Sequence, residues 1–183
     1  MCHNTANKYL QILKQVLKMS VDQGWISSGP FSGFKCKYEE TRRERLTMGE
    51  IMDLYKKDMH CERLSEVRDV YLFCCFTGFA YQDVFNLTPN HMVSGIDGEK
   101  WIMKNREKTD IPERVPLLPI PLEIIEKYKN HPYCTSNGRL LPVNINQRYN
   151  AYLKEVAVIS GVKKYLTTHT ARHTFATTVT QTD

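Results

Sequence analysis

Apolar residues recur at intervals of three and four over residues 5–25, between lysines and glutamines. This spacing places them on one face of an amphipathic helix, which Gly24 is suited to end. Residues 31–46 show no such period and are rich in charged residues, so we predict a linker there. The chain therefore divides into residues 1–30, which hold the last helix of a preceding domain, the linker, and a domain over residues 47–183.

Thr47 opens this domain, because Glu50 follows it at the spacing of a helix-capping box. A mostly apolar segment over residues 62–76 predicts a buried helix that closes at Thr77-Gly78. A short helix is expected to follow around residues 81–87.

The helical pattern stops in residues 91–118, where Gly and Asp residues separate short extended segments. We predict a small antiparallel sheet there, with "KWIMK" and "RVPLL" as its clearest strands. Further helices are expected over residues 119–130 and 145–160 and after Thr168, with a loop over residues 131–144. The fold class predicted is mainly α with a small antiparallel β-sheet (α+β).

The chain has 183 residues, of which 42% are hydrophobic, which suits one globular domain and part of a second. No apolar run is long enough to cross a bilayer, and the N-terminus lacks the pattern of a signal peptide. The six cysteines show no C-x-x-C spacing, which favours free thiols over disulfides or a zinc site. We therefore expect a cytoplasmic protein with no membrane partner and no cofactor.

Positive charge gathers in the C-terminal third. Residues 127–182 hold eight Lys or Arg and one acid, Glu155, a net +7, whereas residues 1–126 hold 17 basic and 18 acidic residues, a net −1. Asp183 brings the total to +5. A basic third of this kind indicates a polyanionic partner such as nucleic acid. A solvated basic surface without a partner explains the charge equally well.

The stretch "HTARHTFATT" contains the residues best suited to anion binding and proton transfer. At about 100° per residue, His169, Arg172 and His173 share one face near a helix N-terminus, where free N–H groups attract anions. Arginine grips two phosphoryl oxygens and histidine transfers protons near neutral pH, so the set suits phosphoryl transfer. Simpler roles compete with it: solvated cap residues, a hydrogen-bonded core histidine at His173, or a metal site between the two histidines. The zinc-peptidase pattern needs glutamate where Thr170 stands, so we predict no metal.

The segment "LTTHTARHTFATTV" closely resembles the H-x-x-R box of the tyrosine recombinases, the phage-integrase family. Other segments resemble family elements in the same order. The amino-acid sequence of these segments is most similar to that of integrases from Bacteroidetes mobile elements. They are "NKYLQILKQVLKMSVDQGWISSGPF" (the last helix of a SAM-like core-binding domain), "CCFTGFAYQDVFNLTPNHM" (the first box), "NREKTDIPERVPLLP" (the β-hairpin) and "NQRYNAYLKEVAVISGV" (the helix before the H-x-x-R box).

This resemblance implies a catalytic domain that cuts and rejoins double-stranded DNA through a phosphotyrosine, together with other recombinase protomers and without a metal. It gives Lys108 as general acid, His169 as a proton-transfer residue and Arg172 as a phosphate clamp, with Asp83 and His173 in support. A solvated hairpin lysine and a helix-cap carboxylate are the simpler roles for Lys108 and Asp83. The residues expected to contact DNA are Lys104, Arg106, Lys163 and Lys164.

The sequence departs from the family pattern in two places. The family's first arginine falls two residues after Gly78, where this chain has Ala80, and Arg68 and Arg106 are candidate replacements. The family's later His/Trp box and nucleophilic tyrosine lie downstream of the H-x-x-R box. We therefore expect a tyrosine-recombinase catalytic-domain fold, incomplete at the C-terminus, in a truncated chain that binds DNA but lacks the nucleophile.

Two other hypotheses remain open at this stage. The first is a non-catalytic DNA-binding or regulatory relative of the same fold, which Ala80 favours. The second is a metal-dependent hydrolase that uses His169 and His173.

Overall fold

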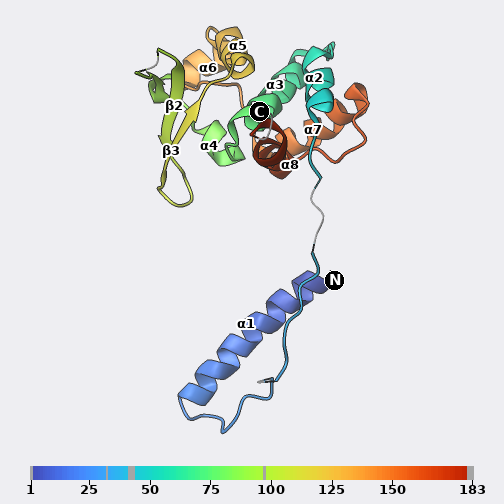
Figure 1. The fold of residues 1–183 in the computed structure, drawn as a ribbon, viewed down its shortest axis with the longest axis vertical. Helices are drawn as coiled ribbons and strands as arrows, with labels where there is room; N and C mark the ends of the chain where they lie inside the picture. The colour runs from blue at the N-terminus through green and yellow to red at the C-terminus, as the bar shows by residue number, and fades with distance from the viewer. Residues whose placement is uncertain (1, 32, 41–43, 97, 181–183) are drawn as a thin grey trace. The chain divides into compact units, whose positions relative to one another are not determined.

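The chain folds into two compact units, Met1–Arg42 and Arg43–Asp183 (Figure 1). The structure is a computed structural model. It describes residues 2–31, 33–40, 44–96 and 98–180.

The first unit consists of α1 (His3–Asp22) and an irregular segment that returns along it. The predicted amphipathic helix is confirmed. Asn4 donates to the backbone carbonyl of Glu39 and accepts from its N–H, both at 2.8 Å. The Tyr38 hydroxyl donates to the Gln11 side chain at 2.7 Å. Part of the segment assigned to a linker therefore packs against α1, although it is irregular as expected.

The second unit is mainly helical with one three-stranded sheet, so the predicted fold class is confirmed. In chain order its elements are α2 (Met48–Lys56), α3 (Glu62–Thr77), α4 (Tyr81–Phe85), η1 (Pro89–His91), β1 (Met92–Ser94), β2 (Lys100–Asn105), β3 (Pro112–Pro116), α5 (Pro119–Tyr128), α6 (Pro132–Asn137), α7 (Asn146–Ser160), α8 (Thr168–Thr174) and η2 (Phe175–Val179), the last a π-helical turn.

Local sequence signals account for several of these boundaries. Thr47 and Glu50 form the predicted capping box at the start of α2. Gly78 and Gly161 adopt left-handed conformations, with φ of 72° and 70°, and end α3 and α7. The loop expected over residues 131–144 is wrong in part, because α6 lies within it. Only Cys134 of that helix is buried, so its sequence carries no apolar period.

The three strands are antiparallel in the order β1-β2-β3. Ile102 pairs with Met92 on one side and Val115 on the other. Its side chain is fully buried and joins the sheet to the core. The strand predicted from "KWIMK" is therefore confirmed, and the one predicted from "RVPLL" is confirmed in part, because β3 begins and ends two residues earlier.

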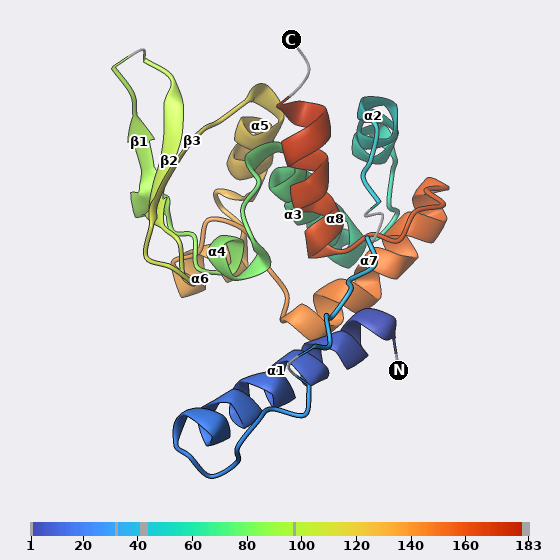
Figure 2. The same ribbon diagram turned by 60° about the horizontal axis from the view of Figure 1, so that its bottom comes forward.

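α3 is the centre of the core. Its residues Tyr71, Leu72, Phe73 and Cys75 have no exposed surface, and α2, α5, α7 and α8 contact it. Figure 2 shows the sheet at one side of this unit, α2 and α7 at the other, and α3 and α8 between them. The six cysteines are free thiols. None of the described helices is long and apolar enough to span a membrane.

Candidate functional site

Threonine hydroxyls fix α8 in place. Thr167 caps the helix by accepting from the Thr170 N–H at 3.1 Å. The buried Thr174 hydroxyl accepts from the backbone N–H of Leu46 at 2.9 Å and donates to the Thr170 carbonyl at 2.8 Å. One turn later, Thr178 donates to the Leu46 carbonyl at 2.7 Å. The two bonds to Leu46 tie α8 and η2 to the segment that precedes α2.

A close contact at Gly78 brings the end of α3 against η2. A Cβ built on Gly78 would lie 2.4 Å from Cδ1 of Phe175, far inside van der Waals distance. Glycine therefore serves two purposes, since it adopts a positive φ and leaves room for the ring. The turn leads directly to Ala80 and α4, which lines a cleft together with α8.

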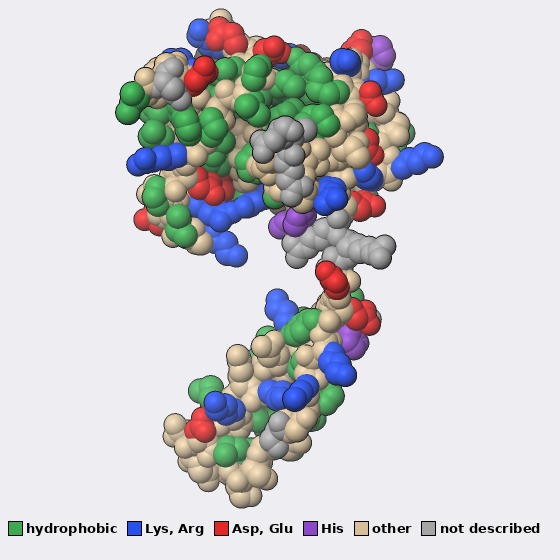
Figure 3. Space-filling view, viewed as in Figure 1, with side chains coloured by type: hydrophobic (Ala, Val, Ile, Leu, Met, Phe, Trp, Pro, Cys, Tyr) green, Lys and Arg blue, Asp and Glu red, His purple; other side chains and the backbone are tan. Residues whose placement is uncertain are grey.

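This cleft, about 620 Å³ in volume, holds three cations from two elements. The half-buried Arg172 comes from α8, while Arg106 and Lys108 come from the turn that joins β2 to β3. Within the part of the chain that the structure describes, Arg172 and Lys108 make no hydrogen bond or ion pair, whereas Arg106 lies 3.4 Å from Glu113. The remaining lining residues are Ala80, Gln82, Asp83, Glu107 and Thr109. Figure 3 shows Lys and Arg side chains gathered at the lower edge of this unit, beside the hairpin turn.

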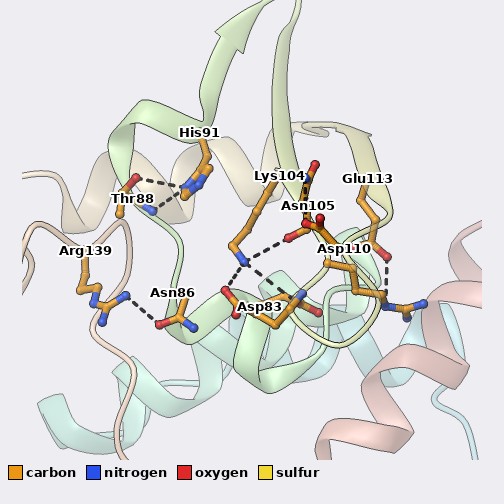
Figure 4. A network of polar contacts seen from close by, with 11 residues as sticks. Asp83, Asn86, Thr88, His91, Lys104, Asn105, Asp110, Glu113 and Arg139 are labelled. Atoms are coloured by element: carbon orange, nitrogen blue, oxygen red, sulfur yellow. Dashed lines mark hydrogen bonds and ion pairs between the residues drawn. The ribbon is translucent and has the colours of Figure 1, made fainter.

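A partly buried polar network supports the hairpin turn (Figure 4). The Asp83 carboxylate, 3% exposed as a residue, accepts from the backbone N–H of Glu107 at 3.0 Å. Lys104 Nζ lies 2.7 Å from the Glu107 carboxylate and 4.0 Å from that of Asp83. The hydrogen bond from Lys104 lowers the pKa of Glu107. The network thus joins α4 to the turn that carries Arg106 and Lys108.

These contacts change the interpretation of two predicted residues. The Lys104 side chain is only 6% exposed and already paired, so its position does not suit the DNA contact expected of it. The described contacts of the Asp83 carboxylate are with the hairpin, rather than with the N-terminus of its own helix. Sequence reasoning missed Glu107 altogether, because nothing in its neighbourhood signals a role.

His169 and His173 line a second hollow, of about 420 Å³, to which Arg172 does not contribute. His169 is exposed and His173 half-buried. The carboxylate of Glu44 enters this hollow and accepts from the backbone N–H of Tyr165 at 2.8 Å. The structure therefore gathers Arg172, Lys108 and Asp83 around one cleft and places the histidines around its neighbour on the same helix.

The two lysines before α8 differ in their surroundings. Lys163 is exposed and has no partner among the described residues. Lys164 Nζ lies 2.6 Å from the Glu50 carboxylate, the same group that closes the capping box of α2. Lys163 is therefore free to meet a polyanion, and Lys164 is engaged.

Arg68 and Arg106, the two arginines expected to be candidate replacements, lie in different surroundings. Arg68 donates to Asp69 at 2.8 Å and to the carbonyl of Lys57, and it is absent from the cleft lining. Arg106 lines the cleft with Ala80 and Arg172. Of the two candidate replacements, only Arg106 therefore lines this cleft.

The only residues described that come together closely enough to hold a metal ion are Glu62, Glu66 and His131. Neither His169 nor His173 belongs to that group.

No family model matches the sequence, and neither does any curated protein. Solved structures do match. A lambda integrase dimer (residues 75–356) bound to a COC′ core site has a TM-score of 0.73 at 16% identity, over 95% of this chain and 63% of that one. XerH recombinase bound to difH has a TM-score of 0.66 at 16% identity, over 99% of this chain and 56% of that one.

A lambda integrase tetramer bound to a Holliday junction has a TM-score of 0.68 at 16% identity, over 93% of this chain and 52% of that one. The chain therefore has the fold of the integrase, or tyrosine-recombinase, catalytic domain. It spans between about half and two thirds of the length of these neighbours.

Proposed function

We propose that the cleft binds a backbone phosphate of double-stranded DNA. The observation that carries this proposal is the convergence of Arg172, Arg106 and Lys108 on one cleft from two separate elements. Arginine is suited to grip two non-bridging phosphate oxygens, and guanidinium groups stabilise the charge that develops as a phosphodiester is attacked. A lysine beside them can protonate a departing oxygen.

In this proposal Arg106 takes the part of the missing first arginine, and its guanidinium exchanges the Glu113 carboxylate for the phosphate. Ala80 cannot bind a phosphate, and it lines the same cleft as the Arg106 side chain. Arg172 is the second clamp, Lys108 the general acid, and His169 assists proton transfer from the neighbouring hollow. Asp83 supports the hairpin, and Lys163 extends the contact with DNA.

The complete protein is proposed to be a site-specific recombinase that cuts and rejoins DNA through a phosphotyrosine and works with further protomers. The DNA-bound dimer and tetramer of lambda integrase, which share this fold, support it. The described lining of the cleft includes no tyrosine, so this chain is proposed to supply the phosphate-gripping part of the site. Residues 1–30 are proposed to belong to the core-binding domain and residues 47–183 to the catalytic domain.

A non-catalytic DNA-binding relative is the second candidate, and Ala80 is the observation that favours it. The two candidates differ in what Arg106 does. A recombinase needs its guanidinium on the scissile phosphate, whereas a binding protein uses it as one cation among several.

Duplex-DNA affinity across a salt series tests the phosphate site. We expect Arg172→Ala, Arg106→Ala and Lys108→Ala each to weaken binding and to reduce the slope of log affinity against log salt by about one. Lys129→Ala is the matched control, because Lys129 is exposed and paired with Glu126 on α5, outside the cleft lining. Equal effects of the control and the cleft variants would refute the proposal.

Strand cleavage by the complete protein then separates the two candidates. Loss of cleavage in Arg106→Ala by about 100-fold or more, with cleavage retained in Lys129→Ala, would establish the recombinase. DNA binding without cleavage by the unaltered complete protein would establish the non-catalytic relative.

A further inference from the structure

A histidine and two glutamates converge at the start of α3, outside the lining of both hollows. Glu62 and Glu66 stand one helical turn apart, and His131 directly precedes α6. One ligand atom from each residue lies within 4.8 Å of the others. His131 Nε2 is 3.2 Å from the Glu66 carboxylate.

The surroundings of this group favour a cation. The side chains of Glu66 and His131 are only 16% and 18% exposed, whereas Glu62 is exposed to solvent. The carboxylates of Glu62 and Glu66 repel each other, and little solvent surrounds Glu66 to screen that repulsion. A divalent ion bound between them would relieve it.

We propose that Glu62, Glu66 and His131 bind a divalent transition-metal ion with the ligand preference of Zn²⁺. Ligands at about 2.0 Å around a tetrahedral zinc ion stand about 3.3 Å apart, close to the separation of Nε2 and the Glu66 carboxylate. The exposed Glu62 side chain can rotate to become the third ligand, and water completes the coordination. An imidazole in the set favours zinc over Mg²⁺ or Ca²⁺, which prefer oxygen ligands.

Such an ion would join α3 to the segment before α6. α6 itself buries only Cys134, so this short helix has little apolar packing to hold it. Nδ1 of His131 is buried and has no hydrogen-bond partner in the described part of the chain. Loss of such a partner lowers metal affinity by about 10- to 100-fold, so we expect a site of modest affinity.

Calorimetric titration of the full chain with Zn²⁺ tests the proposal. We expect one equivalent to bind, and the thermal unfolding midpoint to rise by several degrees at saturation. Glu62→Gln and His131→Gln should each weaken binding by at least about 10-fold. Glu62→Gln is the decisive variant, because an exposed side chain at that position is not needed for folding.

Three controls cover other zinc ligands. His60→Gln removes an exposed histidine that lies 3.0 Å from Asp58, a pair without a second carboxylate. His173→Gln removes one of the two histidines of α8, and Cys61→Ser removes the thiol nearest to Glu62 in sequence. All three should bind Zn²⁺ as the unaltered chain does.

Two results would overturn the proposal. One is the absence of a one-equivalent binding event. The other is binding whose affinity Glu62→Gln leaves unchanged. The proposal concerns a site apart from the cleft, so failure of DNA binding would leave it standing.

Discussion

The carboxylate of Asp83, on α4, accepts a hydrogen bond from the backbone N–H of Glu107 at 3.0 Å. This bond spans 24 residues and joins the short helix after Gly78 to the turn of the β2–β3 hairpin. Lys104, buried beneath that turn, completes the connection through both carboxylates. The position of Arg106 and Lys108 in the cleft therefore depends on the contacts among Asp83, Lys104 and Glu107.

Asp83→Ala is expected to loosen the hairpin. It removes the acceptor of the Glu107 N–H and one counter-charge of Lys104, so the free energy of unfolding should fall by about 1–3 kcal/mol. Amide exchange in the turn should accelerate, and DNA affinity should fall with it. Asp53→Ala, an exposed substitution on α2, is the control. Unchanged exchange at Glu107 in the Asp83 variant would contradict this account.

Gly78→Ala and Gly161→Ala form a matched pair. Both glycines have a positive φ near 70°, but a Cβ at Gly161 meets nothing within 4 Å, whereas one at Gly78 meets the Phe175 ring. Gly161→Ala should therefore cost only the conformational strain, about 1–2 kcal/mol. Gly78→Ala should cost about 1–3 kcal/mol more, because η2 must move. Chemical denaturation measures both, and equal losses would show that the contact with Phe175 is unimportant.

Acid should weaken the hairpin network. Hydrogen bonding to Lys104 lowers the pKa of Glu107 below its ordinary value of 4.5. A carboxylate with a lowered pKa in the folded state stabilises the fold above pH 4.5 and loses that effect as the pH falls through the folded-state value. Urea unfolding at a series of pH values should show this loss. Glu107→Gln and Lys104→Met should each flatten the profile, and a profile unaltered by either variant would refute the pairing.

Lys163 and Lys164 should behave differently although they are adjacent. Lys163→Ala should reduce the salt slope of DNA binding by about one, because its ammonium group is free. Lys164→Ala should change that slope less and should lower the free energy of unfolding by at most about 1 kcal/mol, since Lys164 pairs with Glu50. Salt titration and denaturation of both variants check this contrast, which equal slopes would contradict.

The sequence was sufficient to predict those features that depend on residues close to one another along the chain. The capping box at Thr47 and Glu50, the glycines that end α3 and α7, and the cap of α8 at Thr167 all depend on groups within a few residues. The segments "KWIMK" and "RVPLL" are short extended pieces bounded by Gly and Asp residues. The resemblance of ordered segments to the tyrosine recombinases then gave the fold, which the comparison with lambda integrase confirmed.

The sequence could not determine which side chains meet across the fold. Arg68 and Arg106 were equivalent candidates until the hairpin placed one of them in the cleft. Lys104 had the character of a surface cation, yet it is buried against Asp83 and Glu107. α6 was missed because its polar sequence has no period, and the bonds of Leu46 to Thr174 and Thr178 join residues more than 120 positions apart.

Sequence alone thus determined most of the helices, the hairpin and the chemical groups available to the site. Tertiary structure decided which groups stay free to meet a phosphate and which are used to hold the hairpin. The physical reason is that capping and periodicity depend on local hydrogen bonds and side-chain direction. The availability of a charge depends instead on the burial and partners that close packing of distant segments imposes.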